Sequence, residues 1–287
     1  MKRKILLTAV LLLVSLITLS TAGYAWFTMT ATAEVTGMEV TVETVSSLEI
    51  RLDASSEWAQ SVQFTATTPD QTDVSSDGLT FYKQLQDADG TATGYEKINA
   101  NNGHWVEQTI YFRTSAPTNV YVGNGTAVTP KVTDVTANPT SKSAYGPFSK
   151  DYIAGATRVA FLDSAKANPK TWVPNETYQL SGSGSSWTFD PSGTAETSHT
   201  YINGTDLSST ATFTPYMTTA QINGVNGTTF NSQTLIGETE APTTADGFCY
   251  LTVVVRIWVE GTDREAKNPL AGGTFNVNLQ FWGEERP

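Results

Sequence analysis

Histidine and cysteine, two residue types common among catalytic bases, nucleophiles and metal ligands, are scarce in this chain. The 287-residue sequence contains two histidines, His104 and His199, and a single cysteine, Cys249. No His-Glu-x-x-His motif surrounds either histidine and no serine lies in a Gly-x-Ser-x-Gly motif, so neither a zincin-type protease nor a nucleophile-elbow hydrolase is indicated. Cys249 lies on the apolar side of a predicted strand, which is typical of a buried small hydrophobic residue. We therefore expect no catalytic residues and a protein that is not an enzyme.

The aspartates of the chain could bind a structural calcium ion. The run that begins at Asp87 looks like a calcium loop, but its glycine, Gly90, comes fourth rather than sixth. Asp70, Asp73 and Asp77 could gather on a structural calcium ion, whereas solvated surface acids are the more common state. We expect no cofactor and assign no metal ligands, with calcium at these aspartates as the alternative.

Seven tryptophans raise the possibility of a carbohydrate site, because indole rings stack on sugar rings. Trp258 and Trp282 lie on the polar sides of two predicted strands near the C-terminus. They are the candidate ligand-stacking aromatics. The alternative for both residues is packing beneath an insertion.

The elements that would position these residues are β-strands. Odd positions from Cys249 to Val259 are apolar, and the same period of two recurs from Phe275 to Phe281. Two such runs joined by a loop most simply form an antiparallel pair. Shorter runs with strand character lie at 38–42, 48–52, 106–112, 120–122 and 156–162.

Long polar segments separate these strands, at about 54–100, 123–149 and 163–247. They exceed the usual connections between strands, so we expect insertions with short strands of their own, for example at 171–173, 186–189 and 211–213. The pattern predicts an all-β fold, an antiparallel β-sandwich with jelly-roll-like topology and long loop insertions. Residues 26–287 are expected to form one elaborated domain, in which 164–246 is a large insertion or a small second lobe.

The N-terminus has the three parts of an export signal. Basic residues at positions 2–4 precede an apolar run from Ile5 to Ala22 and a small-x-small site that ends at Ala25. Residues 1–25 are therefore predicted to be a signal peptide, which signal peptidase cuts between Ala25 and Trp26. The alternative is an uncleaved membrane anchor, because the apolar run is close to the roughly 20 residues that span a bilayer. We expect a secreted or cell-surface protein, anchored in the membrane if the segment is not cleaved.

The charge balance narrows the range of partners. The chain has 28 acidic and 17 basic residues, and without Lys2, Arg3 and Lys4 the basic count falls to 14, which leaves a formal charge of −14. A strongly acidic chain is a poor partner for nucleic acid. A single cysteine also excludes an intramolecular disulfide, so packing must stabilise the exported fold.

Two sequence regions resemble a known group. The run Gly-Tyr-Ala-Trp-Phe-Thr at 23–28, followed by Thr-Gly-Met-Glu-Val-Thr-Val at 36–42, resembles the exported proteins of Gram-positive bacteria that carry a SipW-dependent signal peptide, among them TasA and camelysin. Residues 256–263, with the glycine pair at 272–273, are similar to uncharacterised secreted clostridial proteins. The resemblance implies a jelly-roll fibre subunit whose freed N-terminal segment completes the sheet of the next subunit. The donor segment would run from Trp26 to Val35 and include Phe27 and Met29.

These observations lead to one main hypothesis and two alternatives. We expect a non-enzymatic exported structural or surface protein, a fibre subunit of a biofilm matrix that acts by self-association. Its expected partners are other copies of itself, signal peptidase, and cell-wall or extracellular polysaccharide. The first alternative is a monomeric carbohydrate- or host-binding surface module. The second is a glycoside hydrolase, whose paired acids would meet only in space.

Overall fold

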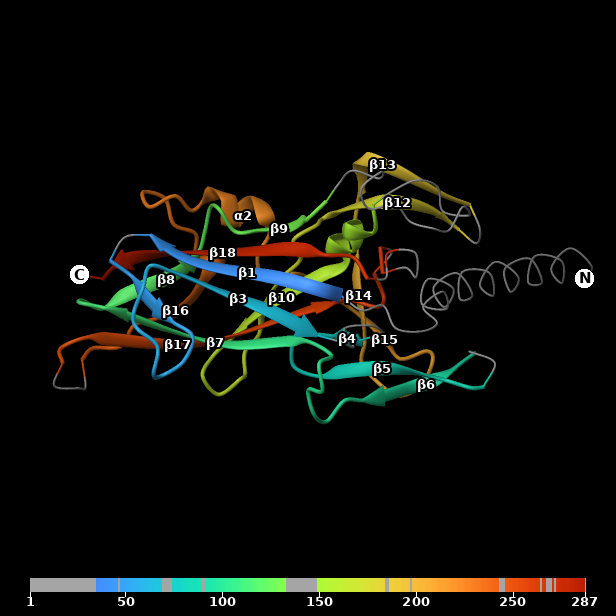
Figure 1. The fold of residues 1–287 in the computed structure, drawn as a ribbon, viewed down its shortest axis with the longest axis horizontal. Helices are drawn as coiled ribbons and strands as arrows, with labels where there is room; N and C mark the ends of the chain where they lie inside the picture. The colour runs from blue at the N-terminus through green and yellow to red at the C-terminus, as the bar shows by residue number, and fades with distance from the viewer. Residues whose placement is uncertain are drawn as a thin grey trace, which may run out of the picture.

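Strands dominate the computed structural model, which describes residues 35–286 except 46, 69–73, 89–90, 133–148, 184–185, 197, 243–245, 264, 267–269 and 271 (Figure 1). The expected β-rich class is confirmed. The predicted signal peptide, with Ala25 and Trp26 at its boundary, lies outside the described residues. Within these ranges, no helix is long and apolar enough to cross a membrane.

The elements follow in chain order. The strands of the first half are β1 (Val35–Val45), β2 (Glu49–Arg51), β3 (Ser61–Thr68), β4 (Val74–Ser76), β5 (Phe81–Gln86), β6 (Ala92–Lys97), β7 (Val106–Thr114), β8 (Thr118–Val122) and β9 (Ala127–Pro130). Those of the second half are β10 (Thr157–Leu162), β11 (Lys170–Trp172), β12 (Thr177–Ser183), β13 (Ser186–Ala195), β14 (His199–Ile202), β15 (Thr210–Phe213), β16 (Leu235–Glu238), β17 (Cys249–Val259) and β18 (Phe275–Glu285). The helical elements are η2 (Lys150–Ala156), α2 (Thr219–Gly224) and η3 (Ser232–Thr234).

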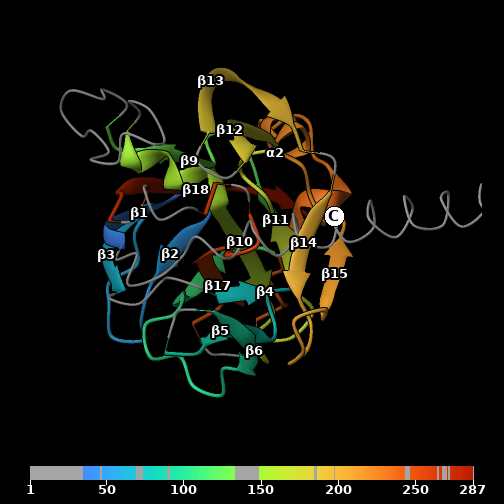
Figure 2. The ribbon, with the colours of Figure 1, turned by 90° about the vertical axis from the view of Figure 1, so that its right-hand side faces the viewer.

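The first of two large sheets has six strands in mixed arrangement. Its order is β16-β8-β18-β1-β3, and β9 pairs with the other end of β18. β1 runs parallel to β18, whereas the other named pairs of this sheet are antiparallel. Figure 2 shows β3 at the margin of this sheet, next to β1.

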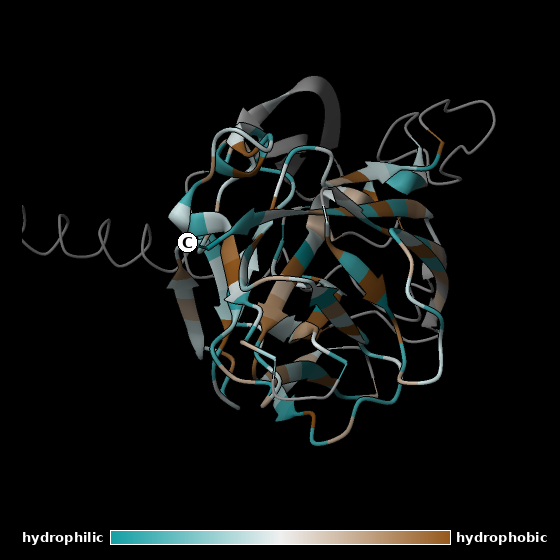
Figure 3. Ribbon diagram, turned by 90° about the vertical axis from the view of Figure 1, so that its left-hand side faces the viewer, coloured by the Kyte–Doolittle hydropathy of each residue, from teal (hydrophilic) through white to brown (hydrophobic). Residues whose placement is uncertain are grey.

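The second large sheet has five antiparallel strands in the order β11-β10-β17-β7-β2. Figure 3 shows that the ribbons of the fold carry both hydrophobic and hydrophilic bands, as strands with a core on one side do. On β17, Val253, Val255 and Ile257 belong to the main hydrophobic cluster, as the apolar side of the predicted strand requires.

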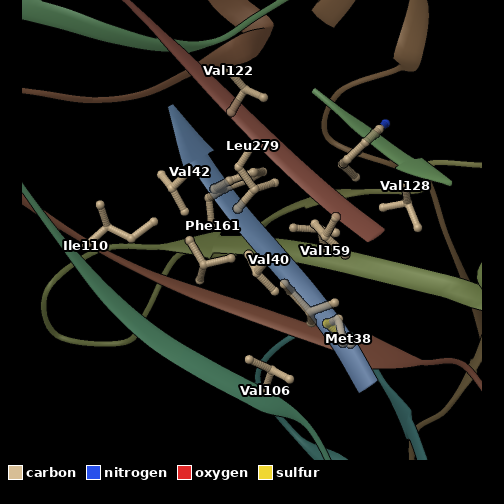
Figure 4. Close-up of a cluster of buried hydrophobic side chains, with 14 of the residues drawn as sticks. Met38, Val40, Val42, Val106, Ile110, Val122, Val128, Val159, Phe161 and Leu279 are labelled. Carbon is tan, nitrogen blue, oxygen red and sulfur yellow. The ribbon is translucent and has the colours of Figure 1, made fainter. Parts of the chain in front are cut away.

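Side chains from both large sheets form one hydrophobic cluster. Met38, Val40 and Val42 of β1 meet Val159 and Phe161 of β10 in this cluster (Figure 4). The five side chains are almost completely buried. Burial of each such side chain contributes about 1.5–3 kcal/mol relative to exposure, so this cluster is the main source of stability that the described fold offers in place of disulfides.

The expected antiparallel pair of β17 and β18 is wrong. β17 pairs with β10 and β7, while β18 pairs with β1, β8 and β9 in the other sheet. The apolar sides of the two sheets instead meet across the core, where Phe281 of β18 packs edge-on against Phe112 of β7, with ring centroids 5.0 Å apart. Two alternating runs predict two strands, but their apolar sides are buried both when the strands pair in one sheet and when they face each other from two sheets.

The polar segments contain strands, as expected. Segment 54–100 forms β3 and the three-stranded sheet β4-β5-β6. Segment 164–246 supplies β11 and β16 as edge strands of the two large sheets, and forms the two-stranded sheets β12-β13 and β14-β15. The sheet β4-β5-β6 covers the second face of β17, where Phe81, Val254 and Trp258 share a separate hydrophobic cluster. This cover explains why β17 is buried on both faces, although its sequence alternates.

Candidate functional site

The open edge, by which we mean the outer side of β3 where no described strand pairs, is the candidate site for self-association. The edge strand β3 has the sequence Ser-Val-Gln-Phe-Thr-Ala-Thr-Thr, without a charged residue or a proline. Among the described strands it pairs only with β1. Natural sheets commonly protect an edge with Lys, Pro, a bulge or a covering segment, because an unprotected edge can pair with another chain. β3 shows neither Lys nor Pro and is long enough to accept a strand.

Alternate backbone groups of β3 face away from the sheet. The N–H of Thr44 donates to the carbonyl oxygen of Gln60 over 2.8 Å, immediately before β3. Hydrogen-bonded and non-hydrogen-bonded pairs alternate along an antiparallel ladder. Counting along the register therefore makes Thr41 and Gln63 a non-hydrogen-bonded pair. The backbone N–H and C=O of Gln63 point outward, where no described residue forms a backbone hydrogen bond with them.

The two faces of β3 differ in character. Val62, Phe64 and Ala66 pack against the main hydrophobic cluster. The side chain of Gln63 lies on the opposite, exposed face, where its amide donates to Thr41 Oγ1 over 3.2 Å. A strand added beside β3 would thus place one set of its side chains at the rim of the hydrophobic core and the other set toward solvent.

The predicted donor segment lies largely outside the described residues. This applies to Trp26, Phe27 and Met29. Val35, the last residue of the segment, begins β1, where its backbone pairs with Thr68 of β3 in the same chain. The segment 26–34 is therefore joined directly to the strand beside the open edge.

Trp258 has no exposed face for a ligand. Its side chain is 0% exposed, and its ring lies edge-on to Phe81 with centroids 5.5 Å apart. The indole Nε1 donates to Glu260 Oε2 over 3.0 Å. The stated alternative, packing beneath an insertion, describes its position, because the sheet β4-β5-β6 lies over the polar side of β17.

Trp282 is partly buried against two glycine-containing turns. Its Nε1 donates to the carbonyl oxygen of Asn124 over 3.3 Å. A Cβ atom added at Gly123 would lie 2.2 Å from Trp282 Cδ1, and one at Gly227 would lie 2.5 Å from Cζ3. The ring thus fills space that only glycine leaves open, so it is held by the fold.

Replacement of Gly123 by alanine is expected to destabilise the protein by about 1–3 kcal/mol, because the added methyl group displaces the Trp282 ring. Urea unfolding followed by tryptophan fluorescence measures the loss. Gly224→Ala is the matched control, since a Cβ there meets nothing within 4 Å. Alanine at this helical position should be neutral or slightly stabilising. Equal losses in the two variants would contradict this account of Trp282.

Two residues considered for catalysis or metal binding, Cys249 and Asp77, have structural positions. Cys249 is fully buried, which confirms its interpretation as a small core residue. Asp77 caps a turn, where its Oδ1 accepts from the N–H groups of Leu79 and Thr80, both over 2.9 Å. Asp70 and Asp73 lie outside the described residues. In the described part of the chain, no three His, Cys, Asp or Glu side chains form a group that could hold a metal ion.

A buried ionic cluster, which the sequence did not reveal, surrounds Arg158 of β10. Arg158 pairs with Asp263, and its Nη2 atom also lies 3.6 Å from Glu196 Oε1. These side chains are 1%, 2% and 4% exposed, respectively. The other carboxylate oxygen of Glu196 lies 2.9 Å from His199 Nδ1, although the pair lacks hydrogen-bond geometry. The only signal in the sequence is an arginine that alternates with Val159 and Phe161 in a predicted strand.

Electrostatics make this cluster structural rather than catalytic. Burial alone would lower the pKa of Arg158, but the charges of Asp263, Glu196 and Glu260 together outweigh it and raise that pKa. Burial raises the pKa of Asp263 in spite of the opposing charge of Arg158, and repulsion from the Glu196 carboxylate raises it further. A substrate cannot reach groups that are so deeply buried. The cluster therefore ties the loop after β17 and the connection between β13 and β14 to β10.

The fold and the site together define a β-rich protein with mixed and antiparallel sheets, in which the edge strand β3 pairs only with β1 among the described strands. No protein-family model matches the sequence, and no curated protein matches it either.

Proposed function

We propose that this protein is a non-enzymatic exported structural protein whose subunits self-associate into fibres of an extracellular matrix. The observation that carries this proposal is the open β3 edge, with the outward backbone groups of Gln63 and no charge or proline along the strand. Two sheets that share one core support a β-sandwich subunit, and a jelly-roll topology is the version that the sequence resemblance implies.

The proposed contact joins the N-terminal segment of one subunit to β3 of the next. Cleavage after Ala25 would leave Trp26 as the first residue of the exported chain. The segment 26–34 would then extend from the start of β1, beside the Thr68 end of β3. Addition of a strand pairs the outward backbone groups and removes the edge. Export and assembly would then depend on the same cleavage.

Replacement of Gln63 by proline tests the acceptor edge. Proline removes an N–H group that faces outward and leaves the β1–β3 ladder intact, so the fold should be kept while assembly is lost. The mature protein from Trp26 onward is expected to form filaments or large oligomers, seen by electron microscopy and size-exclusion chromatography. The Gln63→Pro protein should be monomeric, with a circular dichroism spectrum like that of wild type.

Gln63→Val is the matched control, because it keeps the N–H group and favours a strand. It should assemble like wild type. Deletion of residues 26–34 tests the donor and should also give a monomer. A wild-type protein that stays monomeric at high concentration would overturn the proposal, and so would a Gln63→Pro protein that assembles normally.

A further inference from the structure

The donor segment carries the same period of two as the strands of the fold. Residues 27–34 read Phe-Thr-Met-Thr-Ala-Thr-Ala-Glu, so every odd position is apolar and every even position is polar. These residues lie outside the described part of the chain. A strand with this pattern has one apolar and one polar face, which fits a sheet with a core on one side and solvent on the other.

The outer side of β3 offers a matching pair of faces. Val62, Phe64 and Ala66 are only partly buried, although they pack against the main hydrophobic cluster. Gln63 is exposed on the opposite face. A strand beside β3 would cover the remaining surface of the three apolar side chains with its own apolar face. The lengths also match, since β3 has eight residues and the run 27–34 has eight as well.

The position of the segment restricts how copies can be joined. It leads directly into Val35, the first residue of β1, and β1 runs antiparallel to β3. A segment that continues the line of β1 into the next subunit runs antiparallel to the β3 of that subunit when the two β1 strands point the same way. Copies that point the same way repeat by one operation and build a polar fibre. Parallel pairing would turn the second copy end over end, which favours a closed pair of subunits that exchange their segments.

The backbone groups of the edge favour the same direction. The N–H and C=O groups of Gln63 both point outward, and an antiparallel partner forms both hydrogen bonds through one opposite residue. A parallel ladder is slightly less stable per residue. Antiparallel pairing that covers all of β3 and keeps the apolar faces together places position 27 opposite 68 and position 34 opposite 61. Met29 then lies opposite Ala66, and Thr32 lies opposite Gln63.

We infer that residues 27–34 of one copy pair antiparallel with β3 of the next, with their apolar side chains toward the core, in a polar fibre whose strands run along the fibre axis. The inference rests on the proposed function, because it specifies how the same edge is filled. The partner is a second copy of this chain in the same orientation. Strands along the axis distinguish this fibre from an amyloid fibril, in which the strands lie across the axis.

Paired cysteines in the mature protein test the direction. In an antiparallel contact, the Thr32→Cys/Gln63→Cys protein should form disulfides between subunits, because a Cα separation of about 5.5 Å is suitable for a disulfide. Oxidised filaments should give a ladder of covalent oligomers on a non-reducing gel, and reduction should return them to monomer. The Thr28→Cys/Gln63→Cys protein reports a parallel contact and should give no ladder. Cys249 is fully buried and is kept in both proteins.

Charge substitutions test which face of the segment points inward. Met29→Asp would place a carboxylate at the rim of the hydrophobic core, so the protein concentration needed for assembly should rise about tenfold or more. Thr30→Asp is the matched control, because that position faces solvent, and should change this concentration by about twofold or less. Sedimentation of filaments over a range of protein concentrations measures both effects. Circular dichroism spectra like that of wild type would show that both variants fold.

The outcomes separate this inference from the proposed function. A ladder through position 32, together with loss of assembly in Met29→Asp alone, supports the inference. Filaments that cross-link through position 28 instead, or that tolerate Met29→Asp as well as Thr30→Asp, would overturn the inference and leave the fibre in place. A disulfide that forms only within one chain would also overturn it. Wild type that stays monomeric would overturn the proposed function itself.

Discussion

Replacement of Arg158 by methionine is expected to destabilise the protein by about 3–5 kcal/mol, because it leaves two buried carboxylates without their cation. Asp263 and Glu196 both depend on this guanidinium, and both side chains are almost completely buried. Methionine preserves much of the side-chain volume, so the loss reports charge rather than a cavity. Urea unfolding at neutral pH measures it.

The defect of Arg158→Met should shrink in acid. Without the arginine, burial raises the pKa of Asp263 still further, so the unpaired carboxyl can be neutralised by protonation as the pH falls. Unfolding curves across the acidic range should therefore converge on those of wild type. Lys83→Met is the control, since its pair with Glu96 is exposed and contributes only about 0–1 kcal/mol. A loss in Arg158→Met that is no larger than in Lys83→Met would refute the role of the cluster.

The sequence predicts strands better than it predicts their partners. A period of two identifies β1, β17 and β18, because an alternating strand needs only a core on one side. It cannot say which strands share a sheet, as the wrong pairing of β17 with β18 shows. The polar parity of Trp258 likewise allows either a solvent-facing residue or one packed beneath an insertion, and a three-stranded sheet from a distant polar segment covers that side. Cover of this kind depends on tertiary contacts and leaves no local signal.

The candidate sites follow the same rule. Val62, Phe64 and Ala66 alternate within a polar segment, so a strand at β3 could have been predicted. That it is an edge strand depends on the order of the whole sheet. Arg51 of β2 and Tyr250 of β17 lie almost two hundred positions apart in the sequence, and only the strand register, in which both strands pair with β7, brings them into one sheet. Long-range pairing is the physical information that a local pattern lacks.

Replacement of Glu260 by alanine is expected to cost about 2–4 kcal/mol, because it leaves several buried donors unsatisfied. Glu260 Oε2 accepts from the Ser76 N–H over 3.1 Å and from Trp258 Nε1 over 3.0 Å. Its Oε1 accepts from the Thr262 hydroxyl group over 2.8 Å. These bonds link the end of β17 to β4. The substitution should therefore accelerate hydrogen exchange of the amide groups in β4 more than it does in β1. Glu96→Ala is the control, because Glu96 is exposed on β6 of the same small sheet.

The pH dependence of Glu260→Ala should run opposite to that of Arg158→Met. Burial raises the pKa of Glu260 above its ordinary value, in spite of the hydrogen bonds that lower it. The folded state therefore holds this proton more tightly than the unfolded state, and the resulting stability is present in acid and is lost as the pH rises through the folded pKa. Alanine removes that contribution, so its deficit relative to wild type should be largest in acid and smaller at neutral pH. The stability deficits of Arg158→Met and Glu260→Ala should therefore change in opposite directions as the pH falls, although Arg158 and Glu260 interact. Deficits that change in the same direction would contradict this account and show that the cluster titrates as one unit through Arg158.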